Sequence, residues 1–276
     1  MALPTRFVKM TGGGNDFLLF EADGRALTAE DRRRLALLCR RGLAVGADGL
    51  LFLSEGSPGK LRLDYFNADG RLASFCANGT RCAARYAVAR KLVEGREAVL
   101  ETGWGQIPAR VEASAVTLSL PSVSVPGDSI SISLEGLPRQ AFPIEVGVPH
   151  LVVFVGSELQ RLPVDRIGPP LRHHASLPDG ANVNFVYVSA RQALAVRSYE
   201  RGVEAETLAC GSGVVASAVV AARQGLVHPP VSCDTKSGVR FTVSFREENG
   251  AAVDVRLSGD ARVIYSGELT EEAWQQ

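Results

Sequence analysis

The sequence carries no excess of charge of either sign. Its 276 residues include 30 lysines and arginines and 30 aspartates and glutamates, so the formal net charge is zero. The one arginine cluster, residues 32–34, falls in an expected helix, where we expect it to face solvent. Proteins that bind nucleic acid usually gather positive charge on one face. We therefore expect no nucleic-acid partner.

Long apolar runs are missing as well. Residues 1–10 contain no apolar core of signal-peptide length. The longest apolar stretch, residues 214–222, is far shorter than the roughly 20 residues that span a membrane. We therefore expect a soluble, cytoplasmic protein with no membrane partner.

Lysine is rare and cysteine is odd in number. The four lysines at positions 9, 60, 91 and 236 lie in no setting typical of a pyridoxal cofactor, and nothing else suggests a cofactor. Five cysteines in a chain without a secretion signal argue against a disulfide framework. The spacing of Cys76 and Cys82 is not that of a zinc site, so we expect no metal. We expect Cys39, Cys82 and Cys233 to be buried small hydrophobic residues, Cys233 in a short strand.

The other two cysteines, Cys76 and Cys210, each precede a run of small residues typical of a packed helix. A thiol at a helix N-terminus is expected to have a lowered pKa. Two such thiols could act on opposite sides of one substrate atom and move a proton from one face of a carbon to the other. We interpret the pair as candidate catalytic groups.

The two cysteines lie 134 residues apart, and other features recur at the same offset. This period is too long for a solenoid repeat, so we infer a duplicated domain. The matches are Gly46-Ala47-Asp48 with Gly180-Ala181-Asn182, Tyr65 with Tyr199, and Gly13 with Gly147.

Each half contains many short strand-like segments and one helix that is apolar on nearly all sides and must therefore be buried. The sequence predicts an α+β fold of two similar pseudo-symmetric domains, each a curved, mostly antiparallel sheet wrapped around a central helix. We expect domains over residues 1–120 and 121–262, with 263–276 packing on the first. Strands are expected at 6–10, 17–21, 49–54, 61–67, 98–102, 106–111, 116–120, 141–146, 151–155, 183–188, 193–199, 239–245, 253–257 and 262–265.

Three further segments carry local expectations. A capping box at Thr28 predicts a helix that runs to about Arg41 and ends at Gly42. Residues 121–138 indicate a linker with one edge strand. His173 and His174 fall in a proline-rich segment that we expect to be an exposed loop.

Loop residues near the two cysteines complete the candidate site. The segment Thr11–Phe17 contains three glycines but matches no nucleotide-binding motif, so we interpret it as a tight turn that carries Asn15. Backbone N–H groups of Asn78, Gly211 and Ser212 at the helix starts could bind a carboxylate. His150 and the dipeptide Glu200–Arg201 each follow a predicted strand, and arginine binds carboxylates with a two-pronged geometry.

At this point the motifs resemble those of the diaminopimelate epimerases, over nearly the whole chain. The matching segments are TGGGNDF (11–17), GAD (46–48), YFNADG (65–70), CANG (76–79), GVPH (147–150), ERG (200–202) and ETLACGSG (206–213). The resemblance implies an isomerase of lysine and peptidoglycan precursor synthesis, a cofactor-independent epimerase interconverting L,L- and meso-diaminopimelate. It implies the family fold of two domains, each with strands around a central helix, and possible homodimers.

The resemblance also implies residue roles. Cys76 and Cys210 would be the acid/base pair, with Glu200 and His150 beside the reacting centre. The residues that would bind the substrate are Asn15, Asn67, Asn182, Arg201 and also Glu200 through their side chains and Ala77, Asn78, Gly211 and Ser212 through their backbone.

Three positions depart from the family pattern: Ala77 and Gly49 replace a glycine and a glutamine, and Val148 replaces an asparagine that helps to bind the distal group. These departures leave open a cysteine-pair racemase of another amino acid, such as histidine. A thiol-redox or metal-binding module built on Cys76 and Cys82 is a more remote alternative, and it would give Cys210 no role.

Overall fold

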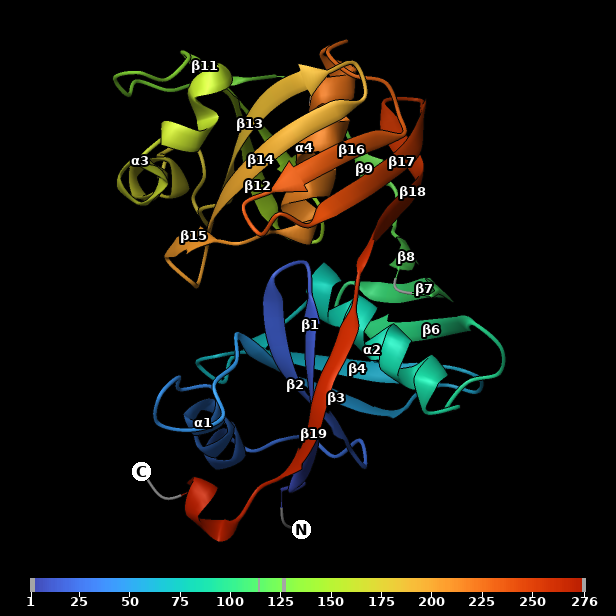
Figure 1. Cartoon of the computed structure of the whole chain (residues 1–276). Helices are drawn as coiled ribbons and strands as arrows, with labels where there is room; N and C mark the ends of the chain where they lie inside the picture. The colour runs from blue at the N-terminus through green and yellow to red at the C-terminus, as the bar shows by residue number, and fades with distance from the viewer. Residues whose placement is uncertain (1–2, 114, 126–127, 275–276) are drawn as a thin grey trace. The chain divides into compact units, whose positions relative to one another are not determined.

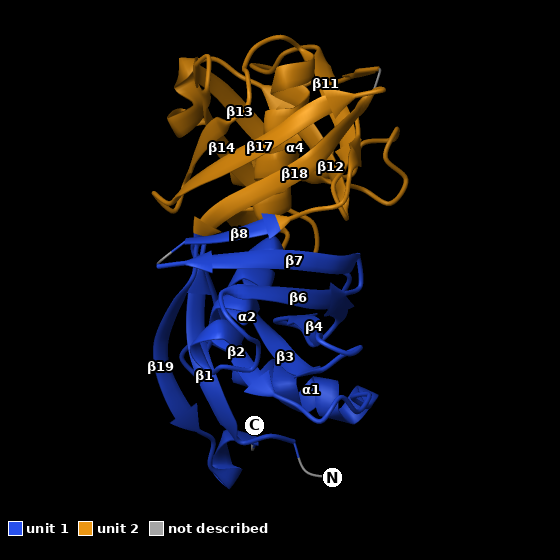
Figure 2. Ribbon diagram, turned by 90° about the vertical axis from the view of Figure 1, so that its right-hand side faces the viewer, with its two compact units in different colours: residues 1–118, 260–276 blue, residues 119–259 orange. Residues whose placement is uncertain are grey.

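A computed structural model describes residues 3–113, 115–125 and 128–274. The chain forms two compact units, unit 1 from residues 1–118 and 260–276 and unit 2 from residues 119–259 (Figure 2). These divisions lie two and three residues from the expected domain boundaries.

Unit 1 contains a curved sheet with a helix against it (Figure 1). Adjacent strands are antiparallel except for the pairs β2–β3 and β4–β6, which are parallel. A short strand, β5 (Leu72–Ala73), pairs with the end of β4. In spatial order the strands are β19 (Arg262–Glu268), β1 (Arg6–Gly12), β2 (Asn15–Glu21), β3 (Gly49–Glu55), β4 (Leu61–Asn67), β6 (Glu97–Thr102), β7 (Gly105–Glu112) and β8 (Ala115–Ser119).

The central helix of unit 1 is α2 (Ala77–Ala89), which packs against β1, β2, β3, β4, β6, β7 and β19. Ten of its thirteen residues are buried. The expectation of an apolar helix covered residues 83–89, but α2 begins earlier, and its buried residues include Arg81, whose side chain is fully enclosed. The sheet therefore wraps a helix that carries a buried cation near its N-terminus.

Two further elements belong to unit 1, a second helix and a 3₁₀ turn near the C-terminus. Helix α1 (Ala29–Leu38) begins with the predicted capping box at Thr28, but it ends three residues before Arg41. It ends there because the backbone N–H groups of Gly46 and Ala47 fold back onto the carbonyls of Leu38 and Cys39. A 3₁₀ turn at Glu271–Trp274 follows β19.

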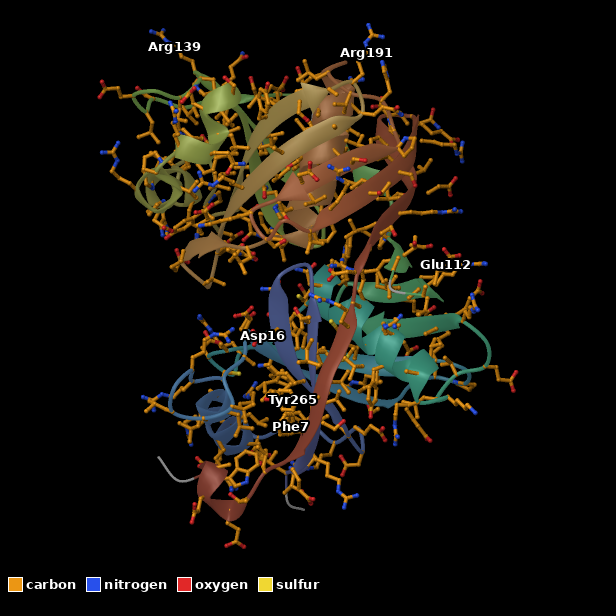
Figure 3. All side chains as sticks on the ribbon, in the orientation of Figure 1. Phe7, Asp16, Glu112, Arg139, Arg191 and Tyr265 are labelled. Atoms are coloured by element: carbon orange, nitrogen blue, oxygen red, sulfur yellow. The ribbon has the colours of Figure 1, made fainter. Side chains whose placement is uncertain are left out.

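The last strand is tied to the first one by aromatic contact. Phe7 on β1 and Tyr265 on β19 meet edge to face, with ring centroids 6.0 Å apart and an interplanar angle of 77° (Figure 3). Edge-to-face pairs of this kind add to the stability that burial gives. Residues 262–268 are therefore an integral strand of unit 1.

Unit 2 repeats this arrangement. Its sheet is antiparallel except for the pairs β12–β13 and β14–β16, and β15 (Ala205–Thr207) pairs with the end of β14. In spatial order the strands are β10 (Ile130–Ser131), β11 (Gln140–Glu145), β12 (Pro149–Phe154), β13 (Asn182–Ala190), β14 (Ala193–Glu200), β16 (Val231–Thr235), β17 (Arg240–Glu248), β18 (Ala251–Asp260) and β9 (Val123–Ser124). The central helix, α4 (Gly211–Arg223), packs against β11, β12, β13, β14, β16 and β17.

Eight strands of unit 2, from β10 to β18, repeat the spatial order of unit 1 and its alternation of parallel and antiparallel pairs, and β9 adds a further strand beyond β18. The register also agrees: Phe17 pairs with Gly49, and Leu151 pairs with Val183, which are the positions 134 residues later. The match of Tyr65 with Tyr199 is wrong. In unit 2 Tyr199 lies opposite Val183, whereas in unit 1 the residue opposite the equivalent Gly49 is Asn67. Tyr199 therefore corresponds to Asn67. A bulge and a different turn length in the β13–β14 hairpin produce this shift.

Two expectations about unit 2 are wrong. Residues 121–138 do not form a linker with one edge strand, because β9 and β10 both pair within unit 2, while residues 126–127 lie outside the description. The proline-rich segment before His173 is helix α3 (Val164–Arg172), which contains Pro169 and Pro170. Val164, Ile167 and Leu171 bury one face of α3, and this packing outweighs the hydrogen bonds that the prolines remove. His173 caps the helix C-terminus and is exposed, so the expected exposure of this histidine is confirmed although the segment before it is helical.

No helix in the described part of the chain combines the length and the apolar character that crossing a membrane requires.

Candidate active site

In unit 1 the candidate site begins at Cys76, the N-cap of α2. The residue has an extended backbone, and its sulfur accepts a hydrogen bond from the Gly79 N–H at 3.4 Å. Gly79 is required here because a Cβ would lie 2.8 Å from the Leu51 side chain. The helix start and this N–H both favour a negative charge on the sulfur. Cys76 is partly exposed, whereas Cys82, six residues later on the same helix, is fully buried.

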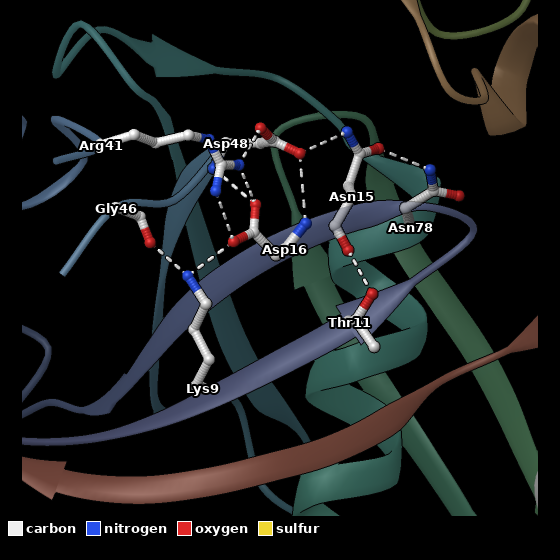
Figure 4. Close-up of polar contacts among 8 residues, drawn as sticks. All are labelled: Lys9, Thr11, Asn15, Asp16, Arg41, Gly46, Asp48 and Asn78. Atoms are coloured by element: carbon white, nitrogen blue, oxygen red, sulfur yellow. Dashed lines mark hydrogen bonds and ion pairs between the residues drawn. The ribbon is translucent and has the colours of Figure 1, made fainter. Parts of the chain in front are cut away.

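A chain of polar contacts leads away from the same helix turn. The Asn78 amide donates to Oδ1 of Asn15 at 2.7 Å, and the Asn15 amide donates to Oδ2 of Asp48 at 3.0 Å (Figure 4). At the other end, Nη2 of Arg81 donates to Oδ1 of Asn78 at 2.6 Å. Asn15 lies at the start of β2, after a tight β1–β2 turn with positive φ at Gly13, as the sequence predicts.

Ion pairs hold the far end of this chain. Asp16 bonds Lys9 at 2.6 Å and also contacts Arg41, which reaches Asp48 at 2.7 Å (Figure 4). Burial alone would raise the pKa of Asp16, but the hydrogen bonds and charges of Arg41 and Lys9 outweigh it and lower the pKa. Asp16 is therefore a carboxylate at neutral pH, and it anchors two cations beside Asp48.

Asn67 ends β4, opposite Gly49 at the start of β3. Its backbone is held in a turn, where its N–H bonds the carbonyl of Arg71 and its own carbonyl accepts from Gly70. Its side chain is partly exposed and bonds none of the other described residues. The amide of Asn67 is therefore available to a ligand.

In unit 2 the corresponding cysteine, Cys210, is the N-cap of α4 and is 6% exposed. Its sulfur lies 3.5 Å from the hydroxyl oxygen of Ser212, and either atom can be the donor. Gly213 must lack a side chain because a Cβ would lie 2.1 Å from Oδ1 of Asn184. The first turn of α4 is thus packed directly against the side chain of a buried asparagine.

His150, on β12, is entirely buried beside this turn. Its Nδ1 lies 3.1 Å from the amide nitrogen of Asn184, whose Oδ1 accepts from the Ser198 hydroxyl at 2.8 Å. Because the Asn184 amide donates, Nδ1 must accept, and the ring proton is on Nε2. Burial, and then the charge of Arg201, lower the pKa of His150 to about 3. His150 is therefore a neutral imidazole with a buried Nε2–H that has no partner among the described residues.

Asn182 and Arg201 lie on neighbouring strand ends. Asn182 pairs with His150 between β12 and β13, and its Oδ1 accepts from the Arg201 N–H at 2.8 Å. Within the described parts of the chain, the Arg201 guanidinium bonds a single backbone carbonyl, that of Asp179, at 3.1 Å. Glu200 ends β14 and accepts from the Thr207 hydroxyl. Unit 2 thus groups Asn182, Arg201 and His150 as the sequence predicts.

The segment between Arg201 and Cys210 is anchored by Glu206, a residue that the sequence analysis did not single out. Its carboxylate binds Arg197 through two hydrogen bonds of 2.6 and 2.8 Å and also binds Lys236 at 2.5 Å. Arg197 further donates to the carbonyls of residues 159, 160 and 162. Because the Glu206 side chain is only 3% exposed, this cluster fixes the strand that leads into Cys210.

Each unit therefore assembles its own share of the expected residues. Unit 1 carries Cys76, Ala77, Asn78, Asn15 and Asn67 around the start of α2, the start of β2 and the end of β4. The sequence analysis missed Asp48, Arg81, Asn184 and Ser198 as members of the site. The pattern Asn182-x-Asn184 within an apolar strand was a usable signal, because residues two apart on a strand share a face.

Comparison with known proteins agrees with this arrangement. The family model for diaminopimelate epimerase matches residues 7–121 and 142–263. A diaminopimelate epimerase from Methanothrix thermoacetophila is 37% identical and covers 98% of this chain and 97% of its own length. One from Aquifex aeolicus is 35% identical and covers 96% of this chain and 98% of its own.

The chain belongs to the diaminopimelate epimerase family. The sequence-based recognition is therefore confirmed.

Solved structures share the fold of this diaminopimelate epimerase family member at low identity. A probable proline racemase from Agrobacterium radiobacter K84 matches with a TM-score of 0.73 at 14% identity, over 98% of this chain and 95% of its own. A phenazine biosynthesis protein of the PhzF family from Bacillus anthracis matches with a TM-score of 0.71 at 15% identity, over 98% and 100% of the two chains. These likenesses confirm the predicted α+β architecture.

Proposed function

We propose that this protein interconverts L,L- and meso-diaminopimelate without a cofactor and uses Cys76 and Cys210 as its acid/base pair. The observation that carries the proposal is that this chain, a member of the family, begins both of its sheet-wrapped helices, α2 and α4, at a cysteine N-cap. Relatives named diaminopimelate epimerase match this chain over nearly its full length. A cytoplasmic homodimer acting in lysine and peptidoglycan precursor synthesis is part of the same proposal.

The reaction inverts one carbon, so a proton must leave one face and another must arrive at the opposite face. In the proposed step, the thiolate of one cysteine removes the α-proton, and the thiol of the other donates its proton to the carbon. The electron pair passes through the α-carboxylate and returns to the new C–H bond. After turnover the two cysteines have exchanged protonation states, which makes the enzyme ready for the reverse reaction.

The negative charge that builds on the α-carboxylate is the main energetic obstacle. Backbone N–H groups in the first turn of a helix have no carbonyl partner within that helix. We assign the N–H groups of Ala77 and Asn78 in unit 1 and of Gly211 and Ser212 in unit 2 to this carboxylate. Donors fixed before the reaction stabilise the developing charge without reorganisation.

The remaining residues would hold the rest of the substrate. We assign Asn15, Asn67, Asn182 and the guanidinium of Arg201 to substrate binding. Glu200 and the buried Nε2–H of His150 are assigned to the neighbourhood of the reacting carbon, where the neutral imidazole acts as a donor and not as a base. A buried donor without a partner is unfavourable by about 1–3 kcal/mol, so a substrate acceptor there would gain that energy.

The test is turnover of diaminopimelate in D₂O under reducing conditions. The wild-type protein is expected to exchange L,L- and meso-isomers and to incorporate deuterium at the α-carbon. Cys76→Ala and Cys210→Ala are each expected to reduce turnover by a hundredfold or more, as loss of a general acid or base does. Near wild-type turnover in either variant would overturn the two-thiol mechanism.

Cys39→Ala serves as the matched control. Burial raises the pKa of Cys39 to about 12, so this thiol is neutral at working pH and we expect its loss to leave turnover intact. Equal loss of activity in all three variants would indicate a structural effect instead.

A second candidate within the same chemistry is a cysteine-pair racemase of a different amino acid. Val148, partly exposed between Gly147 and His150, supplies no polar group where the family pattern has an asparagine. A substrate panel that compares diaminopimelate with histidine and other single-centre amino acids separates the two candidates.

A further inference from the structure

Two of the asparagine amides of unit 1, those of Asn15 and Asn78, form a hydrogen-bonded chain with a charged group at each end. The order is Arg81, Asn78, Asn15 and Asp48, joined by contacts of 2.6, 2.7 and 3.0 Å. Asn78 is 2% exposed and Arg81 is fully buried, so water does not compete for most of this chain.

The charged groups at the two ends of this chain of hydrogen bonds allow each amide only one orientation. A guanidinium can only donate hydrogen bonds, and a carboxylate can only accept them. Arg81 therefore requires the oxygen of Asn78, which turns the Asn78 nitrogen toward Asn15. Asp48 requires the nitrogen of Asn15, which turns the Asn15 oxygen toward Asn78. Reversing either amide would place donor against donor or acceptor against acceptor.

Asp48 itself is held in a fixed position. Its Oδ2 accepts from the backbone N–H of Asp16 at 3.2 Å as well as from Asn15, while its Oδ1 accepts from Arg41 at 2.7 Å (Figure 4). Its own N–H donates to the Asp16 carbonyl at 2.9 Å. Both carboxylate oxygens are thus engaged, so the carboxylate cannot rotate to release the Asn15 amide without losing several bonds.

The repeat gives an independent reason to connect Asp48 with the site. Asp48 occupies the position in unit 1 that Asn182 occupies in unit 2, because the flanking pairs Phe17–Gly49 and Leu151–Val183 share one register. In unit 2 this position carries an assigned substrate-binding side chain. In unit 1 the equivalent side chain instead binds Asn15, which has the assigned role.

We propose that Asp48 is a positioning residue that fixes the orientation of the Asn15 amide and thereby determines where Asn15 offers its remaining N–H and oxygen lone pair to the substrate. This proposal rests on the proposed function. It assigns Asp48 no contact with the substrate, since both of its carboxylate oxygens are already occupied.

The central test is a double-mutant cycle on diaminopimelate epimerisation. Asp48→Asn keeps the shape of the side chain but replaces one of its two accepting oxygens with a donor nitrogen, so that position 48 no longer requires the nitrogen of Asn15. We expect KM to rise about tenfold, the effect of weakening one charge-assisted hydrogen bond, with kcat within about twofold of wild type. In an Asn15→Ala background, Asp48→Asn should change KM by less than about twofold, because the amide that it orients is gone.

A second variant changes the residue that bonds the oxygen of the Asn15 amide. Asn78→Asp places an acceptor-only side chain against the Asn15 oxygen while Asp48 still holds the nitrogen. It is expected to raise KM even though Asp48 is intact. Asp64→Asn is the matched control, since Asp64 pairs with Arg62 at 3.0 Å in the same unit but outside this chain. Its KM should equal that of the wild type.

The outcomes separate the two proposals. Absence of wild-type turnover on diaminopimelate would overturn the proposed function and this role together. Wild-type turnover combined with independent, multiplicative effects of Asp48→Asn and Asn15→Ala would overturn only the role of Asp48. A wild-type KM in Asp48→Asn, or in Asn78→Asp, would also overturn it.

Discussion

The amide of Asn184 donates to Nδ1 of His150 across 3.1 Å inside unit 2, and this contact decides the tautomer of the imidazole. The remaining ring nitrogen carries the proton and is buried without a partner among the described residues. Ser198 holds the Asn184 oxygen, so the amide is itself fixed. His150 is therefore prepared to donate one hydrogen bond at neutral pH.

Because His150 is buried and neutral, the free energy of unfolding depends on pH. Burial and the Arg201 charge lower the pKa of His150 to about 3, whereas the unfolded chain takes up this proton near pH 6.5. Between these values the unfolded state binds more protons, so stability falls as the pH falls. We expect His150 to contribute a slope of at most about 1.4 kcal/mol per pH unit below pH 6.5.

Urea unfolding between about pH 7 and pH 5 measures this slope. His150→Asn keeps an acceptor near the Nδ1 position and is expected to flatten the dependence, whatever its effect on stability at neutral pH. His173→Asn changes an exposed histidine of the same unit and should leave the slope unchanged. Equal slopes in the wild type and His150→Asn would contradict the assignment of a neutral, buried His150.

The sequence sufficed for the parts of the fold that repeat. Alternating and apolar segments predicted the strands around both helices, and Leu61–Asn67 has the predicted ends. The paired cysteine N-caps at Cys76 and Cys210 were also predicted, because small residues after a helix start leave a strong local pattern. These features depend on local chemistry and on periodicity, which a single sequence contains.

What the sequence could not supply depends on tertiary contact. Helix α3 forms across Pro169 and Pro170 because its apolar face is buried, and local propensity opposes it. Asp48 has its role through Asn15, which lies 33 positions earlier in the chain, and Asn184 has its role through His150, which lies 34 positions earlier. The spacing of Asn182 and Asn184 places both on one face of a strand, but the neighbouring sequence does not identify the partner that either Asn184 or Asp48 contacts.

Removing the charge of the buried Glu206 should destabilise the protein much more than removing the charge of the exposed Asp234. Burial alone would raise the pKa of Glu206, but the hydrogen bonds and charges of Arg197 and Lys236 outweigh it and lower the pKa. Glu206→Gln leaves the buried Arg197 without its counter-ion and is expected to destabilise the protein by about 3 kcal/mol, as for other broken buried pairs.

Asp234→Asn is the comparison, because Asp234 pairs with Arg240 at 2.7 Å while both side chains are at least half exposed. This change should lower stability by less than about 1 kcal/mol. Denaturant unfolding of the two variants at neutral pH measures the difference. If they lose equal stability, Glu206 does not anchor the strand that leads into Cys210.

Gly213→Ala tests how closely the start of α4 is packed. The added Cβ would lie 2.1 Å from Oδ1 of Asn184, so Asn184 must move and give up its contacts with His150 and Ser198. We expect a loss of about 1–3 kcal/mol in unfolding free energy, typical of overpacking, together with a fall in epimerase turnover. Gly156→Ala in the same unit provides the control, since its Cβ would meet nothing within 4 Å and its φ is −75°. Calorimetry and turnover of both variants check this, and a Gly213→Ala protein as stable and active as the control would show that Asn184 does not have to be held against α4.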